Sequence, residues 1–308
     1  MPATAEPEPP EPEPVEPEVH GFTDAEGVRI SYYRWPAARP RGLVQIAHGV
    51  GEHARRYDHV AAALTAAGYS VYADDHRGHG RTGLEQWGGD TSRLGRLGPG
   101  GVRAAIAAVR RFTAVVRADA PDLPLAFVGH SWGSLMGQKI LDAHPGDWDA
   151  VVFSGSAYRM PGSMNAGDLG ARHRALGTTG AEWLSRDPAV AQAFVDDPLT
   201  TLTPLMRLFG LADALRMIGR PPRRLPGVPE RADPPLLLLV GDDDPLGGER
   251  SIQRLAAAYL SAGLTDVTAI VYPGARHEVF NELNRDRVLA DLVAWLDERL
   301  AAPDRTRS

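Results

Sequence analysis

Short apolar runs alternate along the chain with longer stretches in which apolar residues recur every three or four positions. Strands are predicted at 28–35, 42–47, 69–74, 124–129, 150–154, 235–240 and 267–272, and helices near 54–67, 100–118, 132–144, 249–262 and 280–300. Strands that alternate with helices predict an α/β fold, with a mostly parallel central sheet and helices on both faces. Each helix then closes a crossover of the usual hand between two strands.

The segment 236–240 is a continuous apolar run, Leu-Leu-Leu-Leu-Val, between two prolines and a glycine. Such a run is typical of a strand buried on both faces, so we expect it in the middle of the sheet. Residues 157–233 contrast with it, because they hold helical pieces and turn-rich breaks but no convincing strand. The pattern therefore predicts a core made of 20–156 and 234–302, with 157–233 inserted as a helical cap.

Residues 1–19 form a Glu/Pro-rich tail, a composition that cannot bury apolar surface and favours extended, solvated chain. We expect this tail to be disordered. Its six glutamates equal the whole formal charge of −6, so the rest of the chain is close to neutral. A near-neutral body offers no electrostatic footprint for nucleic acid or for an anionic membrane.

The chain contains no cysteine, which excludes a disulfide framework, a zinc–thiolate site and a cysteine nucleophile. No stretch approaches the ~18 apolar residues of a membrane-spanning helix, and the N-terminus lacks the layout of a secretory signal. These features predict a cytoplasmic protein without stable membrane insertion, and they are compatible with transient contact with a membrane surface.

A serine motif follows one of the predicted buried strands. Gly129-His130-Ser131-Trp132-Gly133 matches G-x-S-x-G between the strand ending near 129 and the helix near 132–144. In this setting the motif predicts a sharp strand-to-helix turn that holds Ser131 in a strained backbone conformation at the carboxyl edge of the sheet. A glycine-rich turn without chemistry is the alternative, and the partners described next argue against it.

Two more loops leave the same edge of the sheet and carry an acid and a base. One is Gly-Asp-Asp-Asp-Pro at 241–245, and the other ends in Arg-His-Glu at 276–278. The order Ser, Asp, His is that of the α/β-hydrolase fold. We therefore predict His277 as the base and Asp244 as the acid that orients it, with Asp243 as the alternative acid, whereas Asp242 fits a solvated turn.

The strand at 42–47 ends in His-Gly-Val-Gly-Glu-His, a glycine-rich turn that opens a helix. In this fold the oxyanion hole is formed by one amide from that loop and by the amide after the nucleophile, which predicts the N–H groups of Val50 and Trp132. His76 and His79 lie in another glycine-rich loop, without a carboxylate at ligand spacing. We therefore predict no metal, and chemistry by a serine, a histidine and an aspartate implies no cofactor.

Taken together, these segments resemble the monoacylglycerol lipase and lysophospholipase branch of the serine α/β-hydrolases, and the likeness runs from about residue 20 to residue 300. The segments that carry it are 48–53 with Arg56-Tyr57, 75–80, 129–133 and 272–277. The resemblance implies hydrolysis of a carboxylic ester through an acyl-enzyme. Monoacylglycerol, lysophospholipid or a simpler lipophilic ester is the small-molecule substrate that it implies.

The resemblance also implies contacts with the substrate. In the family a helical cap forms an apolar acyl channel, for which Met160 and Met164 are candidates here, although such residues can also serve only to pack the cap. The family's alcohol pocket uses the residues that match Glu52 and Arg56, and a histidine three positions beyond the base. That position holds Phe280 in this chain, so we expect an altered alcohol pocket.

The sequence pattern leaves other functions open. The same triad would serve an acyltransferase or a peptidase, and a hydrolase-like protein that only binds its ligand is an alternative outside the enzymes. A serine at 131 argues against the epoxide hydrolases and haloalkane dehalogenases of this fold, whose nucleophile is aspartate. The pattern leaves the oligomeric state, the acyl-chain length and the alcohol undetermined.

Overall fold

The computed structural model describes residues 16–165, 167–222 and 233–300 of the 308-residue chain. The strands in these residues are β1 (Glu18–Thr23), β2 (Arg29–Trp35), β3 (Gly42–Ala47), β4 (Tyr69–Asp74), β5 (Leu125–His130), β6 (Ala150–Ser154), β7 (Leu236–Gly241) and β8 (Val267–Tyr272). The α-helices are α1 (Asp58–Ala66), α2 (Gly80–Gln86), α3 (Gly101–Asp119), α4 (Trp132–Ala143), α5 (Pro188–Asp196), α6 (Leu205–Met217), α7 (Gly248–Ala262) and α8 (Arg285–Leu300).

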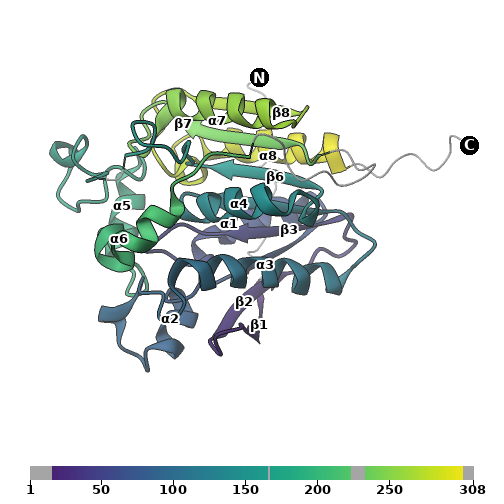
Figure 1. The fold of residues 1–308 in the computed structure, drawn as a ribbon, viewed down its shortest axis with the longest axis horizontal. Coiled ribbons are helices and arrows are strands. Elements are labelled where there is room, and N and C mark those ends of the chain that lie inside the picture. The colour runs from purple at the N-terminus through teal and green to yellow at the C-terminus, as the bar shows by residue number, and fades with distance from the viewer. Residues whose placement is uncertain (1–15, 166, 223–232, 301–308) are drawn as a thin grey trace, which may run out of the picture.

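The eight strands form one sheet in the order β1-β2-β4-β3-β5-β6-β7-β8 (Figure 1). Strand β2 runs antiparallel to both β1 and β4, whereas every other neighbouring pair is parallel. The predicted mostly parallel sheet is therefore confirmed, and β7 lies among the parallel strands as its apolar run indicated. Parallel strands end at one edge, so the loops after β3, β5, β7 and β8 meet there.

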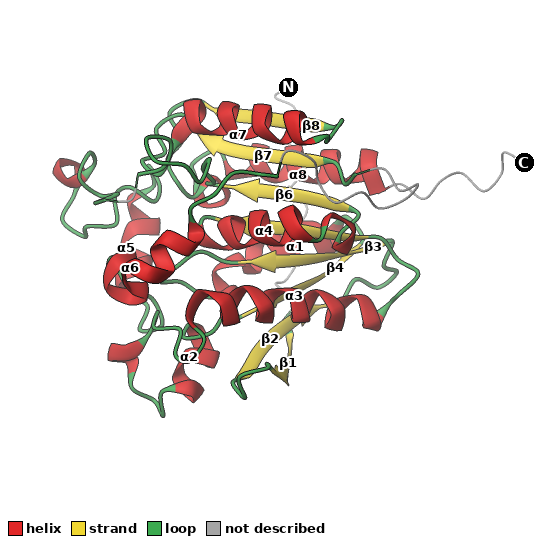
Figure 2. Cartoon of the chain, viewed as in Figure 1, coloured by secondary structure: helices red, strands yellow, loops and turns green. Residues whose placement is uncertain are grey.

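The apolar side chains of the central strands divide between the two faces of the sheet. Leu236 and Leu238 of β7 belong to the core cluster that α3, α4 and α7 cover, whereas Leu237 and Leu239 belong to the cluster under α1 and α8. All four leucines are fully buried. Figure 2 shows α3, α4 and α7 in front of the sheet and α8 behind it. Helices thus cover both faces, as predicted.

The predicted boundary of the tail is wrong by two residues, because strand β1 begins at Glu18. This strand forms one end of the sheet, where the Arg34 guanidinium of β2 donates to the Glu18 carboxylate at 2.9 Å. The ring of His20 stacks on Tyr32 with 5.3 Å between centroids. An edge strand held by such half-exposed contacts lacks a strong apolar pattern, which explains why it was missed. Residues 1–15 of the predicted tail lie outside the described residues.

Two further elements differ from the prediction. Helix α2 was not predicted; its Thr82 hydroxyl accepts a hydrogen bond from Ser31 N–H at 2.8 Å, so a contact with β2 holds this short helix. Helix α8 begins at Arg285 rather than near 280. A short 3₁₀ turn at Val279–Asn281 precedes it. Glu282 was predicted to lie in the helix, but it lies before it, and its side chain accepts a hydrogen bond from Arg276 N–H at 2.8 Å.

The segment 157–233 contains α5 and α6 in its described part, and no strand occurs there. Figure 1 places both helices at the left, where the arrowheads of β6 and β7 point. The segment therefore lies over the carboxyl edge of the sheet. Its role as a separate cap stays a prediction, and residues 223–232 lie outside the described part. None of the helices in the described residues combines the length and apolar character needed to cross a bilayer.

Candidate active site

Ser131 lies at the turn between β5 and α4. Its backbone has φ 48° and ψ −119°, and among the described residues it is the only non-glycine with positive φ. A side chain at Gly133 would collide with the carbonyl oxygens of Ala47 and His48, so the glycine lets α4 approach the end of β3. Positive φ costs a serine about 1–3 kcal/mol, which the surrounding packing must offset. The turn has the predicted geometry of a strained elbow.

His277 and Asp244 form a buried pair. The His277 Nδ1–H donates to Asp244 Oδ1 at 2.9 Å, and both side chains are at most 2% exposed. The Leu246 N–H donates to the same oxygen at 2.9 Å. His277 Nε2 is buried and has no hydrogen-bond partner among the described residues, Ser131 Oγ included. The imidazole is therefore oriented by the carboxylate and keeps one nitrogen free.

The two neighbouring aspartates bind elsewhere. Asp243 Oδ2 accepts from His173 Nε2 at 2.7 Å, and Asp242 Oδ1 accepts from Gly274 N–H at 2.7 Å. Of the three adjacent carboxylates, Asp244 is the one that bonds to His277. The choice that the sequence left between Asp244 and Asp243 thus has a geometric answer.

The loop that carries His277 packs against the serine turn. The rings of His130 and His277 lie 4.9 Å apart between centroids. A Cβ added at Gly155, just after β6, would come within 2.7 Å of both His130 Cε1 and the His277 carbonyl oxygen. Chain segments almost 150 residues apart therefore meet beside Ser131, as the shared sheet edge predicts.

The glycine-rich loop after β3 also lies against Ser131. A Cβ added at Gly49 would stand 3.2 Å from Ser131 Cβ. The Val50 N–H makes no hydrogen bond within the part of the chain that the structure describes. Trp132 is the first residue of α4, where an amide has no acceptor within the helix. Both predicted oxyanion donors are thus unengaged amides on segments that border the serine.

Histidine rings and Trp132 stack under this loop. The Trp132 ring lies 5.3 Å from that of His79 and edge-on to that of His76, whereas His48 stacks on His76 at 3.9 Å. These histidines pack as aromatic rings and also make hydrogen bonds, since His76 Nδ1 donates to Asp74 Oδ2 and His79 Nδ1 to the Arg77 carbonyl, both at 2.8 Å. Within the described residues, no group of three or more histidine and carboxylate side chains is placed to hold a metal ion.

Glu52 and Arg56 are engaged by protein partners. Arg56 Nη1 donates to Glu52 Oε2 at 2.5 Å, and the guanidinium donates to both oxygens of Glu278 at 2.7 and 2.8 Å. Glu52 Oε1 also accepts from Gly49 N–H at 2.5 Å and from the Tyr57 hydroxyl at 2.8 Å. The network joins the loop after β3 to the loop after β8. Sequence reasoning gave Glu278 no role, and its only signal was an acidic residue next to the predicted base.

The guanidinium decides the charge of Glu278. Burial alone would raise the pKa of this carboxyl, but the charge of Arg56 and its two hydrogen bonds outweigh burial and hold the pKa at about 2. Glu278 is therefore ionised at neutral pH, and it stands next to His277 in the chain.

Comparison with known proteins identifies the family. A family model described as "Serine aminopeptidase, S33" matches residues 38–284. The monoacylglycerol lipase of Mycolicibacterium smegmatis is 36% identical over 303 residues, which cover 91% of this chain and 97% of that protein. The chain belongs to this family of serine α/β-hydrolases. The monoglyceride lipase of Mus musculus is 27% identical over 314 residues, or 98% of each chain.

A solved structure agrees with the fold of the hydrolase. The carboxyl esterase of Bacillus coagulans superposes with a TM-score of 0.78 at 24% identity, over 92% of this chain and 99% of that one. At this identity the likeness supports the α/β-hydrolase fold alone.

The segment between β6 and β7 contributes contacts that the sequence did not reveal. The ring of Trp183 lies 5.0 Å from that of His277, and Thr201 N–H donates to the Gly51 carbonyl at 2.8 Å. The segment thus touches both His277 and the loop of the predicted oxyanion donor. Periodicity could not identify these residues, because each contact spans more than 90 residues of chain.

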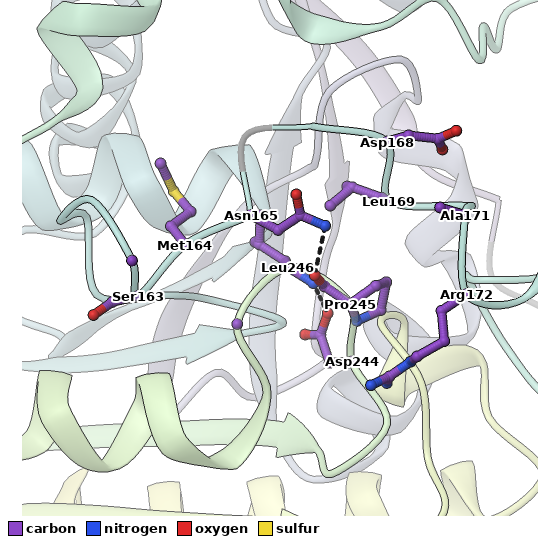
Figure 3. A pocket seen from close by; sticks show the side chains of 12 residues that line it. Ser163, Met164, Asn165, Asp168, Leu169, Ala171, Arg172, Asp244, Pro245 and Leu246 are labelled. Carbon is purple, nitrogen blue, oxygen red and sulfur yellow. Dashed lines mark hydrogen bonds between the residues drawn. The ribbon is translucent and has the colours of Figure 1, made fainter.

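The predicted substrate-contacting residues fall in different places. Met164 lines a hollow of about 460 Å³ beside Asp244, together with the loop that follows Met160 (Figure 3). Met160 is half-buried, and the structure does not place it on that hollow. Phe280 is 2% exposed and belongs to the core cluster beneath α1 and α8. A core side chain therefore occupies the position where the family has a pocket histidine.

The pH dependence of the hydrolase follows from the surroundings of His277. Burial lowers the pKa of this imidazole, but the charge and hydrogen bond of Asp244, with Glu278 and Glu52, outweigh burial and raise the pKa above 6.5. Only the neutral ring can accept a proton, so kcat/KM is expected to fall as the pH drops through a value above 6.5. Ester hydrolysis measured between about pH 5 and pH 9 tests this.

A matched variant supplies the control for this profile. Asp244→Asn removes the nearest negative charge, so the acid limb of its residual activity should move to lower pH. A wild-type inflection below 6.5, or one that stays in place in the variant, would contradict this account of the His277 pKa.

Proposed function

We propose that this protein is a serine carboxylic ester hydrolase that acts on lipophilic esters through an acyl-enzyme. In this proposal Ser131 is the nucleophile, His277 the proton carrier and Asp244 the acid that orients it. The observation that carries the proposal is the buried His277–Asp244 hydrogen bond of 2.9 Å on a loop that packs beside the strained Ser131 turn. A free imidazole nitrogen next to a serine is what nucleophilic activation requires.

The proposed first step is attack of Ser131 Oγ on the ester carbonyl carbon while His277 Nε2 takes the hydroxyl proton. The carbonyl oxygen becomes an anion, and the N–H groups of Val50 and Trp132 donate to it. The C–O bond to the alcohol then breaks, and the imidazolium returns the proton to the departing alkoxide. Asp244 Oδ1 keeps its hydrogen bond to the imidazolium Nδ1–H and stabilises this cation.

The proposed second step repeats this chemistry with water. His277 Nε2 removes a proton from a water molecule, the hydroxide adds to the acyl carbon, and the same amides hold the oxygen anion. The bond to Ser131 breaks when the imidazolium protonates its oxygen, which releases a carboxylic acid. No external oxidant, reductant or cofactor is needed to balance either step.

The proposed substrate class rests on the relatives and on the residues near the site. The protein of M. smegmatis that is 36% identical is named a monoacylglycerol lipase. Aromatic side chains border the site, since the ring of Phe209 on α6 lies 5.0 Å from Trp132, and Trp183 lies 5.0 Å from His277. Such a border suits an acyl chain, so we assign monoacylglycerols or lysophospholipid-like esters as substrates.

The alcohol part of the proposed substrate is less constrained by the structure than its acyl chain. The side chains proposed for the alcohol pocket, Glu52 and Arg56, bond to each other and to Glu278. An alcohol would have to compete with these bonds or use other groups. The proposal also keeps residues 157–233 as a cap, a cytoplasmic location, and transient contact with a membrane surface as the route to lipid substrates.

A hydrolysis panel tests the substrate class. It comprises p-nitrophenyl esters with acyl chains from C2 to C16, a monoacylglycerol and a lysophosphatidylcholine. We expect kcat/KM to be highest for the longer esters and fatty acid to be released from the monoacylglycerol. A preference for C2 and C4 with no action on either lipid would overturn the lipid assignment and leave the serine mechanism in place.

Two further assays distinguish ester hydrolysis from the other activities that the same triad could carry out. Aminoacyl p-nitroanilides test peptidase action, which the "Serine aminopeptidase" description of the family model makes a specific candidate. Product analysis with glycerol as a second acceptor tests acyl transfer, because a new ester would appear beside the free acid. Turnover of anilides without ester hydrolysis would replace the proposed function by peptidase activity.

A further inference from the structure

The His48 ring is held by two backbone contacts at the end of β3. Its Nε2 accepts a hydrogen bond from His76 N–H at 3.0 Å, so this nitrogen carries no proton. The proton of the neutral ring is then on Nδ1, which donates to the Gly49 carbonyl at 2.7 Å. Burial lowers the pKa of His48 well below its usual range, and the neighbouring His76 and His79 act in the same direction. The ring therefore stays neutral in this tautomer.

The carbonyl that His48 holds belongs to the peptide unit whose N–H is that of Val50. A trans peptide is planar, and its C=O and N–H point in opposite directions. No cis peptide occurs in the described chain. Fixing the Gly49 carbonyl on the His48 ring therefore also fixes the direction of the Val50 N–H.

The preceding peptide is held from the other side. Its Gly49 N–H donates to Glu52 Oε1 at 2.5 Å, and Glu52 is 3% exposed. The Arg56 guanidinium and the Tyr57 hydroxyl bond to Glu52 in turn, so this carboxylate cannot easily turn away. Two consecutive peptide units are thus clamped, and the Val50 N–H is left without a partner in the described residues.

We propose that His48 and Glu52 are positioning residues that together aim the Val50 N–H at the oxygen of the tetrahedral intermediate. This inference rests on the proposed function, since it concerns the oxyanion hole of the same ester hydrolysis. It reassigns Glu52 from the alcohol pocket to the oxyanion loop. It also explains a buried histidine that the proton transfers do not use.

Three variants test the role of His48. His48→Phe keeps a flat ring in the stack and removes the donor to Gly49, whereas His48→Asn keeps a donor at the place of Nδ1. His59→Phe is the matched control, because His59 makes the same kind of ring-to-carbonyl bond at 2.9 Å, to Phe280, away from the oxyanion loop. Each variant is assayed for kcat and KM on a p-nitrophenyl ester and for inhibition by a trifluoromethyl ketone with the same acyl chain.

The trifluoromethyl ketone reports on the oxyanion hole directly, because Ser131 adds to its carbonyl and leaves an oxygen anion there. We expect His48→Phe to lower kcat about 10- to 100-fold, with KM within about threefold of wild type, and to weaken the inhibitor by a similar factor. His48→Asn should recover most of both losses, and His59→Phe should lose neither. A merely structural role would change the active fraction and leave the inhibitor affinity of the remaining sites unchanged.

Several results would overturn the inference. One is a His48→Phe variant whose kcat and inhibitor affinity equal those of the wild type. Another is an equal loss of kcat and inhibitor affinity in His48→Asn and His48→Phe. If His48→Phe does not fold, Glu52→Gln and Glu52→Leu make the same comparison, since glutamine keeps an acceptor for Gly49 N–H and leucine does not; equal losses would again overturn it. If the wild type hydrolyses esters and these substitutions have no effect, only this inference is wrong. If the wild type does not hydrolyse esters, the proposed function is wrong as well.

Discussion

Ser131→Ala is expected to lower kcat for ester hydrolysis by about 10⁴-fold or more and to abolish covalent labelling by a fluorophosphonate. The substitution removes the oxygen that would form the acyl-enzyme and leaves the predicted oxyanion donors in place. Alanine keeps the Cβ, and the backbone at φ 48° is no more strained than with serine, so the melting temperature should change little. Intact-mass measurement after labelling, steady-state kinetics on a p-nitrophenyl ester and a thermal melt check the three expectations.

Ser154→Ala is the matched control for this substitution. Ser154 ends β6 at the same edge of the sheet, and its hydroxyl contacts His130 Nδ1 at 3.3 Å. This variant should label fully at one site. Labelling of Ser131→Ala at the wild-type rate would point to another nucleophile. A folded wild type that takes no label at all would favour the hydrolase-like protein that only binds its ligand.

Asp244→Asn is expected to lower kcat by about 10⁴-fold while leaving KM and the fold nearly unchanged. The amide has almost the same shape as the carboxylate, but it carries no charge to stabilise the imidazolium. Its N–H₂ also favours the wrong tautomer of His277, with the proton on the nitrogen that should accept from Ser131. Single-turnover acylation isolates this effect from product release.

The adjacent aspartates supply controls of the same chemistry. Asp243→Asn changes contacts with His173 and Arg172, and Asp242→Asn changes a contact with Gly274 N–H. Both variants should keep kcat within about fivefold of wild type, because neither side chain bonds to His277. A larger loss in Asp243→Asn than in Asp244→Asn would move the role of the acid to Asp243.

Most of the sheet could be predicted from the sequence because its central strands are buried. Seven of the eight strands in the described residues were anticipated, and the run at 236–240 is a parallel strand with every leucine buried. A strand covered on both faces must be apolar throughout, which leaves a strong local signal. Strand β1 is mostly exposed and helix α2 is short, and both depend on contacts with β2, so their local signals are weak.

Pocket residues were the hardest to predict from the resemblance. Family motifs pointed to Glu52, Arg56 and Phe280 as residues that contact the alcohol. In the structure Arg56 lies between two buried carboxylates, and Phe280 packs in the core. The partner that changes this picture is Glu278, which lies 222 residues from Arg56 along the chain. A pair so distant in sequence has no local pattern that would reveal it.

By itself, the sequence determined most of the order of strands and helices and the residue types that reach one edge of the sheet, because apolar periodicity and the rule that parallel strands share an edge are local and general. Only the tertiary structure decided that Asp244 rather than Asp243 bonds to His277. It also decided that His48 bonds to the Gly49 carbonyl and Glu52 to the Gly49 N–H. These choices depend on side-chain directions and on hydrogen bonds of 2.5–2.9 Å between groups whose positions are set only by folding.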